Sequence, residues 1–232
     1  MNETPAMGWE RGSMKTFGQS GLILGILCFA ATASGRAGPF FDFYGYSFSD
    51  GDPTAVGTTT TVATRFNSIQ PEPALSFDFA QYEVTALIED LLAVSVEDHA
   101  PVRTIRYDHG EIRVYQDIEK NSLWEANPPN SEVPHSFEDG DLILTGHFTE
   151  CMMIFNLTGG NGTVQGHVTF TGGSRLAELP QAEGWLFFGG TTRSPQGGLP
   201  LGYSLAWDPQ LLAQAPVPAR RSTWGAVRAM YR

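Results

Sequence analysis

Residues 136–173 read SFEDGDLILTGHFTECMMIFNLTGGNGTVQGHVTFTGG, and this stretch decides the fold class. Between residues 163 and 171 apolar and polar side chains alternate, with Val164, Val168 and Phe170 on one face, as in a strand with one buried side. The segment 141–148 alternates in the same way and then changes phase into the apolar run CMMIF, which predicts a β-bulge or a second covered face. The glycines and asparagine of TGGNG at 158–162 suit a tight turn. The stretch therefore predicts an antiparallel hairpin.

Most other readable segments are also short strand patterns, at 38–48, 54–66, 76–88, 92–96, 185–188 and 203–207. A second tight hairpin is predicted at 102–115, with its turn at Asp108-His109-Gly110-Glu111. A polar, proline-containing loop follows at 119–134, and one helical turn capped by Ser174 is predicted at 175–179. Many short strands separated by turns predict one all-β domain over residues 38–212, an antiparallel β-sandwich or barrel that is jelly-roll-like.

The N-terminal segment has the pattern of an export leader. Residues 21–33, GLILGILCFAATA, are apolar, follow Lys15 and precede small residues, and they are too few to span a bilayer as a helix. We expect residues 1–37 to be a signal peptide, cleaved between Ala33 and Ala37, and the chain to be periplasmic, on the outer surface or secreted. A start at Met14 would give the positive n-region of such leaders, which favours it as the true start. No stable membrane span is expected after the leader is removed.

Charge and cysteine content narrow the function classes. The formal net charge is −11, and such an acidic surface repels phosphate backbones, which argues against nucleic acid as a partner. Of the two cysteines, only Cys151 would survive cleavage, so no intramolecular disulfide is expected. We expect Cys151 to pack as a small hydrophobe. The last segment, residues 213–232, predicts a stiff proline-containing linker and a short, basic, amphipathic helix.

No catalytic residue can be nominated, and the sequence favours a non-enzymatic protein. No G-x-S-x-G motif occurs beyond the leader, and no basic residue adjoins Cys151 to lower its pKa. Zinc is disfavoured: a hairpin centred on Gly160 would place His167 opposite Met153 and His147 opposite Gly173, six positions apart.

We expect no cofactor, and calcium is the alternative that stays open. Its candidate ligands are acidic residues at glycine turns, because calcium prefers oxygen ligands. None of these turns matches the calcium-loop motif, and solvated turn carboxylates are the preferred interpretation. The candidates are Asp50, Asp52, Glu138, Asp139 and Asp141, and Asp108 with Glu111 forms a further acidic turn.

Five segments together resemble a pattern of uncharacterised exported bacterial proteins, many of which carry PEP-CTERM-type sorting tails. These segments are YDHGEIRVYQD, NPPN, SFEDGDLILTGHF, GGNGTVQGHVTFTGG and GYSLAWD. The resemblance covers roughly residues 45–208, and it implies export but no known activity. The tail departs from that group because it has no transmembrane helix. Its ending, STWGAVRAMYR, is similar to short W-G-x-[VI]-[KR] endings, so Trp224, Gly225, Arg228 and Arg232 are candidates for a sorting signal.

Two function classes follow. The preferred one is a secreted or cell-envelope β-rich module, binding or structural, with an unknown surface or extracellular partner. The alternative is a secreted hydrolase acting on polysaccharide or ester substrates. Aromatic residues such as Trp124, Tyr44 and Tyr46 could stack on sugars, although core packing explains most aromatics in such a chain.

Overall fold

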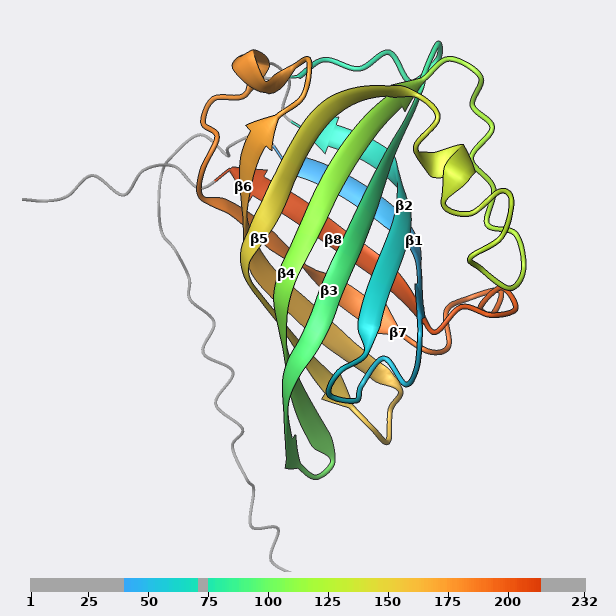
Figure 1. The fold of residues 1–232 in the computed structure, drawn as a ribbon, viewed down its shortest axis with the longest axis vertical. Helices are drawn as coiled ribbons and strands as arrows, with labels where there is room; N and C mark the ends of the chain where they lie inside the picture. Colours follow the sequence, from blue (N-terminus) through green and yellow to red (C-terminus); the bar gives the residue numbers. More distant parts are fainter. Residues whose placement is uncertain (1–39, 71–74, 214–232) are drawn as a thin grey trace, which may run out of the picture. The chain divides into compact units, whose positions relative to one another are not determined.

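The computed structural model describes residues 40–70 and 75–213, and these residues form a closed antiparallel barrel (Figure 1). Each strand pairs with its neighbours in the chain, and β8 closes the sheet against β1. The eight strands are β1 (Phe40–Ser49), β2 (Thr59–Gln70), β3 (Glu83–His99), β4 (Val102–Asp117), β5 (Asp141–Asn156), β6 (Asn161–Gly172), β7 (Trp185–Thr192) and β8 (Leu205–Ala213).

The strand order confirms the predicted all-β barrel and corrects its finer description. In a jelly roll, Greek-key connections pass between two sheets. Here the described strands follow a simple up-and-down meander in a single sheet, so among residues 40–70 and 75–213 there is neither a jelly-roll connection nor a sandwich. The connections after β1, β3, β5 and β7 therefore lie at one end of the barrel, and those after β2, β4 and β6 at the other.

The hairpin of β5 and β6 confirms the prediction made from residues 136–173. Val164, Val168 and Phe170 are buried on the inner face, and Gly160 in the turn has a φ of +65°. The predicted change of phase is a bulge, because the β5–β6 register shifts between Thr145 and Gly146 and again between Phe148 and Glu150.

The second predicted hairpin, at 102–115, is wrong. Both of its arms belong to the single strand β4, and the true turn between β3 and β4 lies at residues 99–102. Asp108 to Glu111 instead form a kink inside β4, where His109 and Gly110 have φ values of +63° and +81°. The segments 76–88 and 92–96, predicted as separate strands, likewise contribute to one strand, β3, which is kinked at Asp90.

The predicted helical turn after β6 is present as a 3-10 turn, Leu176–Glu178. Its capping residue differs from the prediction: Arg175 precedes the turn without a side-chain cap, and the Ser174 hydroxyl donates instead to the Leu142 carbonyl at 3.2 Å.

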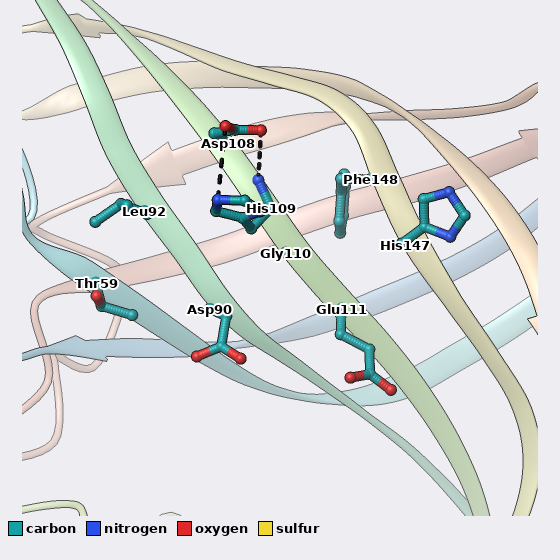
Figure 2. A pocket seen from close by; sticks show the side chains of 9 residues that line it. All are labelled: Thr59, Asp90, Leu92, Asp108, His109, Gly110, Glu111, His147 and Phe148. Atoms are coloured by element: carbon teal, nitrogen blue, oxygen red, sulfur yellow. Dashed lines mark hydrogen bonds and ion pairs between the residues drawn. The ribbon is translucent and has the colours of Figure 1, made fainter.

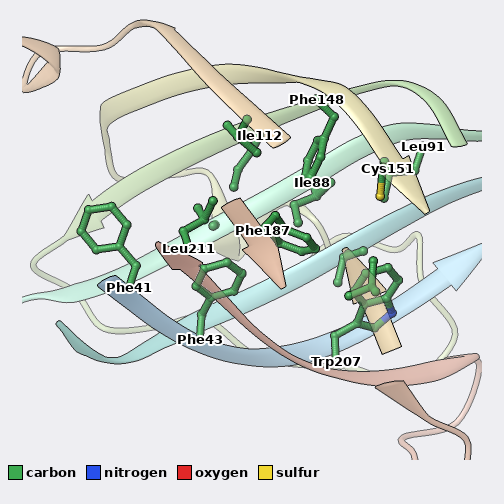
Figure 3. Close-up of a cluster of buried hydrophobic side chains, with 14 of the residues drawn as sticks. Phe41, Phe43, Ile88, Leu91, Ile112, Phe148, Cys151, Phe187, Trp207 and Leu211 are labelled. Carbon is green, nitrogen blue, oxygen red and sulfur yellow. The ribbon is translucent and has the colours of Figure 1, made fainter. Parts of the chain in front are cut away.

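Aromatic side chains fill the interior of the barrel (Figure 3). They follow from the alternation along each strand, which turns every second residue inward between the bulges. Phe41 stacks on Trp185 with ring centroids 5.1 Å apart, and Phe148 meets Phe187 edge-on at 5.0 Å. Seven aromatic side chains of the barrel core are at most 2% exposed: Phe41, Phe43, Phe155, Phe170, Phe187, Trp185 and Trp207. The barrel axis is thus a packed core, and the concave sites lie on the outer surface.

A long connection between β4 and β5, residues 118–140, lies against the outside of the barrel, and we call it the strap (Figure 1). It includes the 3-10 turn His135–Phe137 and buries Val133 and Phe137 against Ala63 and Leu87, which face outward from β2 and β3. The Thr85 hydroxyl donates to the Phe137 carbonyl at 2.8 Å. The strap also meets the β7–β8 connection, where the Asn127 amide donates to the Leu201 carbonyl at 2.7 Å.

The predicted leader (residues 1–37) and all but the first residue of the C-terminal segment (residues 213–232), including its short helix, lie outside the described residues. Within residues 40–70 and 75–213, no helix has the length and apolar character needed to cross a membrane.

Candidate functional site

The ladder between β4 and β5 is interrupted near its middle. Residues 102–107 of β4 pair with 151–156 of β5, and pairing resumes at Glu111 and His147. Between these two stretches, residues 108–110 and 148–150 have no cross-strand partner in this pair of strands. The interruption coincides with left-handed backbone at Asp90 (φ +56°), His109 and Gly110, a conformation that side-chain-bearing residues rarely adopt.

A pocket of about 630 Å³ opens at this interruption, on the outer side of the barrel wall (Figure 2). Its floor is apolar, because Gly110 and Phe148 are buried there, and its rim consists of exposed carboxylates and imidazoles. The rim side chains come from β3 (Asp90), β4 (Asp108, His109 and Glu111) and β5 (His147), and Figure 2 shows how they lie. We call this site the wall pocket; it is lined by Thr59, Asp90, Leu92, Asp108, His109, Gly110, Glu111, His147 and Phe148.

Gly110 is required by the packing beneath the wall pocket. A Cβ atom at this position would lie 2.6 Å from Leu91 Cδ2 and 3.2 Å from Phe148 Cδ2. The positive φ of Gly110 is also unfavourable for any residue with a side chain. The dipeptide His109-Gly110 therefore creates the kink, and the kink opens the wall.

The rim of the wall pocket is predominantly acidic. The Asp108 carboxylate accepts a hydrogen bond from the His109 amide at 2.8 Å and lies 3.7 Å from His109 Nε2. The Glu111 carboxylate accepts from the Thr145 hydroxyl at 3.1 Å and lies 3.8 Å from Arg113 Nε. Within the described part of the chain, Asp90 has neither an ion pair nor a side-chain hydrogen bond.

Arg113, the cation nearest to Glu111, is shared among several acids. Its guanidinium pairs with Glu89 on β3 and lies 3.7 Å from Glu138 of the strap. One arginine therefore faces Glu89, Glu111 and Glu138 together, and the three rim carboxylates of the wall pocket are left with an excess of negative charge.

The calcium candidates divide between the two ends of the barrel. Asp50 and Asp52 lie in the β1–β2 connection, where Asp50 accepts from the Thr59 amide at 2.8 Å and Asp52 from the Thr54 amide and hydroxyl. These hydrogen bonds from Thr54, followed by the charges of Arg193 and Arg103, lower the pKa of Asp52. Both carboxylates thus hold the loop in place.

Glu138, Asp139 and Asp141 lie at the opposite end, where β5 begins. Asp139 accepts from Asn121 Nδ2 at 2.9 Å, and Glu138 faces Arg113. Asp139 and Asp141 also line a second pocket, of about 550 Å³, together with Asp117 and Glu119. In residues 40–70 and 75–213, no group of three or more His, Cys, Asp and Glu side chains has an arrangement that could hold a metal ion.

The predicted register of the two histidines is wrong. His167 lies opposite Glu150 and His147 opposite Thr169, because the turn is centred nearer to Thr158 than to Gly160 and β5 carries bulges. At this register the two histidines are three positions apart along β5 (147 to 150) and not six. His167 Nδ1 instead lies 2.6 Å from a Glu150 carboxylate oxygen, and His147 lines the wall pocket.

Cys151 packs inside the barrel as predicted, and its burial raises the pKa of the thiol to about 12. The sorting-tail candidates Trp224, Gly225, Arg228 and Arg232 lie outside the described residues. Sequence reasoning found Asp108, His109, Gly110 and Glu111 as a polar turn, but it missed Asp90 and His147. No local sequence pattern marks these two residues as members of the pocket, because only the pairing of β3 and β5 with β4 brings them there.

Neither the protein-family models, nor the curated proteins, nor the solved structures gave a significant match to this chain, so the candidate site stands on its geometry alone.

Proposed function

We propose that this chain is an exported, non-enzymatic binding module of the cell envelope or the secreted space, and that its wall pocket binds a ligand bearing a positive charge. The observation that carries the proposal is the break in the β4–β5 ladder, which opens the wall over an apolar floor. A volume of about 630 Å³ is in the range of small-molecule sites.

The charge of the rim selects the class of ligand. Asp90, Asp108 and Glu111 project from the rim, and the nearby guanidinium of Arg113 is already engaged by Glu89 and Glu138. Because the apolar floor includes Phe148 and Leu92, the favoured ligand combines a cationic group with an apolar body. A basic side chain of a protein partner meets the same description as a free amine.

A matched pair of probes tests this assignment on the full chain. Tryptamine and indole-3-acetate share a ring and differ in the sign of their charge. We expect tryptamine, or another arylalkylamine of the same series, to raise the melting temperature, because a ligand that binds only the folded state stabilises it. Indole-3-acetate should have no effect. If no amine of the series raises the melting temperature, or if the anion is equally effective, the assignment is wrong.

Two isosteric variants localise the binding. Asp90→Asn removes the charge and keeps a residue type that tolerates the left-handed backbone at this position. Glu111→Gln removes a second rim charge. Both should weaken amine binding about tenfold, the equivalent of about 1.4 kcal/mol. Glu97→Gln, the same change at an exposed acid of β3 outside the pocket, should bind like the unaltered chain.

The hydrolase alternative makes a different prediction for the same variants. A hydrolase would release product from an ester or a polysaccharide. In Asp90→Asn and Glu111→Gln the rate of product release would then fall by a larger factor than the affinity for the amine. The lining of the wall pocket supplies one hydroxyl, that of Thr59, and no serine or cysteine nucleophile, which disfavours an ester hydrolase. Glycoside hydrolysis needs only two carboxylates beside the scissile bond, and the rim has three, so the product-release assay decides that alternative.

Export is tested separately from binding. Residues 1–37 fused to a reporter enzyme that is active only outside the cytoplasm should give active reporter, and an inactive cytoplasmic fusion would contradict export. A second fusion, of the last twenty residues to an exported reporter, tests the sorting role of Trp224, Gly225, Arg228 and Arg232. A reporter that remains freely secreted would count against that role.

A further inference from the structure

A second polar and aromatic surface lies on the outer side of β8 and β1, away from the wall pocket. Tyr44 and Tyr46 alternate outward along β1 and are both half-buried. The Tyr44 hydroxyl donates to the Tyr46 hydroxyl at 3.1 Å, and the rings meet edge-on with centroids 5.3 Å apart. Trp124 of the strap stands nearly perpendicular to both rings, at 6.4 Å from Tyr44 and 5.2 Å from Tyr46.

These rings are held rigidly before any ligand arrives. The indole nitrogen of Trp124 donates to the Ala63 carbonyl at 3.3 Å, and the Arg65 guanidinium lies 4.4 Å from the centre of its ring. Tyr46 also packs against Tyr203 with ring centroids 5.6 Å apart. A surface that is already ordered loses little conformational entropy on binding.

Planar polar groups adjoin the rings. The β1–β8 register pairs Asp42 with Gln210 and Gly45 with Trp207, which places Asp208 at the level of Tyr44. Gln210 Nε2 donates to Asp42 Oδ1 at 3.4 Å. Burial and the nearby charge of Asp42 raise the pKa of Asp208, so the two carboxylates are close enough to interact. We call the six residues the outer aromatic face: Asp42, Tyr44, Tyr46, Trp124, Asp208 and Gln210.

The chemistry of this surface fits a neutral sugar chain. Sugar rings present C–H faces that pack on aromatic rings, and their hydroxyls donate to carboxylates and accept from amides and phenols. An anionic polymer would be repelled by the carboxylate pair and by the net charge of −11. Because Asp42 and Asp208 are both acidic and Arg65 is already paired with Glu83 at 3.1 Å, a cationic polymer is the competing class, and the chitosan gel distinguishes it from a neutral polymer.

We propose that the outer aromatic face binds a neutral polysaccharide. This site is independent of the wall pocket, which lies over β3, β4 and β5. The ligand class of this surface differs in charge and size from that of the wall pocket.

Affinity electrophoresis of the full chain tests the proposal. Native gels would contain one of three neutral polymers (hydroxyethyl cellulose, galactomannan or soluble starch), the anionic polymer alginate, the cationic polymer chitosan, or none. We expect at least one neutral polymer to retard migration, and alginate to leave migration unchanged. Migration unaltered by all three neutral polymers, or retardation by chitosan alone, would overturn the proposal.

Variants decide whether the retardation arises at this surface. Tyr44→Ala removes a ring and Asp208→Asn removes a charge at an exposed position without changing the side-chain shape. Each should weaken the interaction about tenfold. Phe79→Ala, at an exposed aromatic outside the face, and Glu97→Gln are the matched controls and should bind as the unaltered chain does. If Tyr44→Ala fails to fold, Asp208→Asn decides, and undiminished retardation in Asp208→Asn would reject the assignment.

Discussion

Three polar atoms inside the barrel are buried without a hydrogen-bond partner in the described part of the chain: Ser47 Oγ, Thr191 Oγ1 and Trp207 Nε1. Thr191 lies directly opposite Trp207 across β7 and β8, and the three residues are at most 3% exposed. An unsatisfied buried polar group costs about 1–3 kcal/mol, because its hydrogen bonds to water are lost without replacement. The interior is therefore less stable at these residues than an apolar core of the same shape.

Thr191→Val tests this cost, because valine keeps the β-branched shape and removes the hydroxyl. We expect the free energy of unfolding to rise by about 1 kcal/mol, measured by urea denaturation. Thr64→Val is the matched control, since the buried Thr64 hydroxyl donates to the Ala86 carbonyl at 2.9 Å. That change should lower the free energy of unfolding by about 1 kcal/mol. A loss of stability in Thr191→Val would show that its hydroxyl has a partner in the folded protein.

At the scale of the element, the kinks in β3 and β4 shape the wall pocket. Asp90 on β3 and the pair His109-Gly110 on β4 have left-handed backbone at neighbouring levels of the sheet. Left-handed backbone inside a strand disrupts the ladder locally and turns the strand. Here the disruption separates β4 from β5 over three residues of each strand and opens the wall pocket, whose floor includes the buried Phe148.

Gly110→Ala should destabilise the barrel more than Gly57→Ala does. Both glycines have similar positive φ values, +81° and +86°, so both changes incur the strain of a left-handed alanine, about 1–2 kcal/mol. A Cβ at Gly57 would meet no atom within 4 Å, whereas one at Gly110 would collide with Leu91. We expect an additional loss of about 1–3 kcal/mol for Gly110→Ala, from overpacking. Equal losses in urea denaturation would mean that Leu91 moves aside without cost.

These same kinks limited what the sequence could predict. Alternation along β6 was sufficient to place Val164, Val168 and Phe170 in the core, because a local period of two decides which side chains face inward. The stretch Asp108-His109-Gly110-Glu111 has the composition of a hairpin turn, and local composition does not distinguish a turn from a bulge within a long strand. Asp90 and His147 join the wall pocket only through strand pairing, which no local pattern encodes.

At the scale of the whole molecule, the barrel keeps several phenols away from water. Burial is the largest cause that raises the pKa values of Tyr44, Tyr107, Tyr115 and Tyr203, and it raises that of Tyr203 to about 12. An unfolded tyrosine titrates near pH 10. A group whose pKa is higher in the folded state stabilises the fold below its unfolded pKa, and this contribution is lost as the pH rises toward the folded value. The four tyrosines, which lie on β1, on β4 and beside β8, therefore make the fold lose stability together as the pH rises above 10.

We expect the barrel to unfold cooperatively in the alkaline range above pH 10, with part of the tyrosinate absorbance appearing only as the far-ultraviolet β-sheet signal disappears. Tyr203→Phe should move the midpoint of this transition to higher pH. That change removes one phenol that must ionise, and it also removes a buried hydroxyl without a partner in the described part of the chain. The measurement is a pH titration followed by near-ultraviolet absorbance and circular dichroism on the same samples. Full ionisation of the tyrosines with an unchanged β-sheet signal would contradict this prediction, because it would mean that water reaches these phenols in the folded barrel. Tyr107 and Tyr203 are buried in the structure.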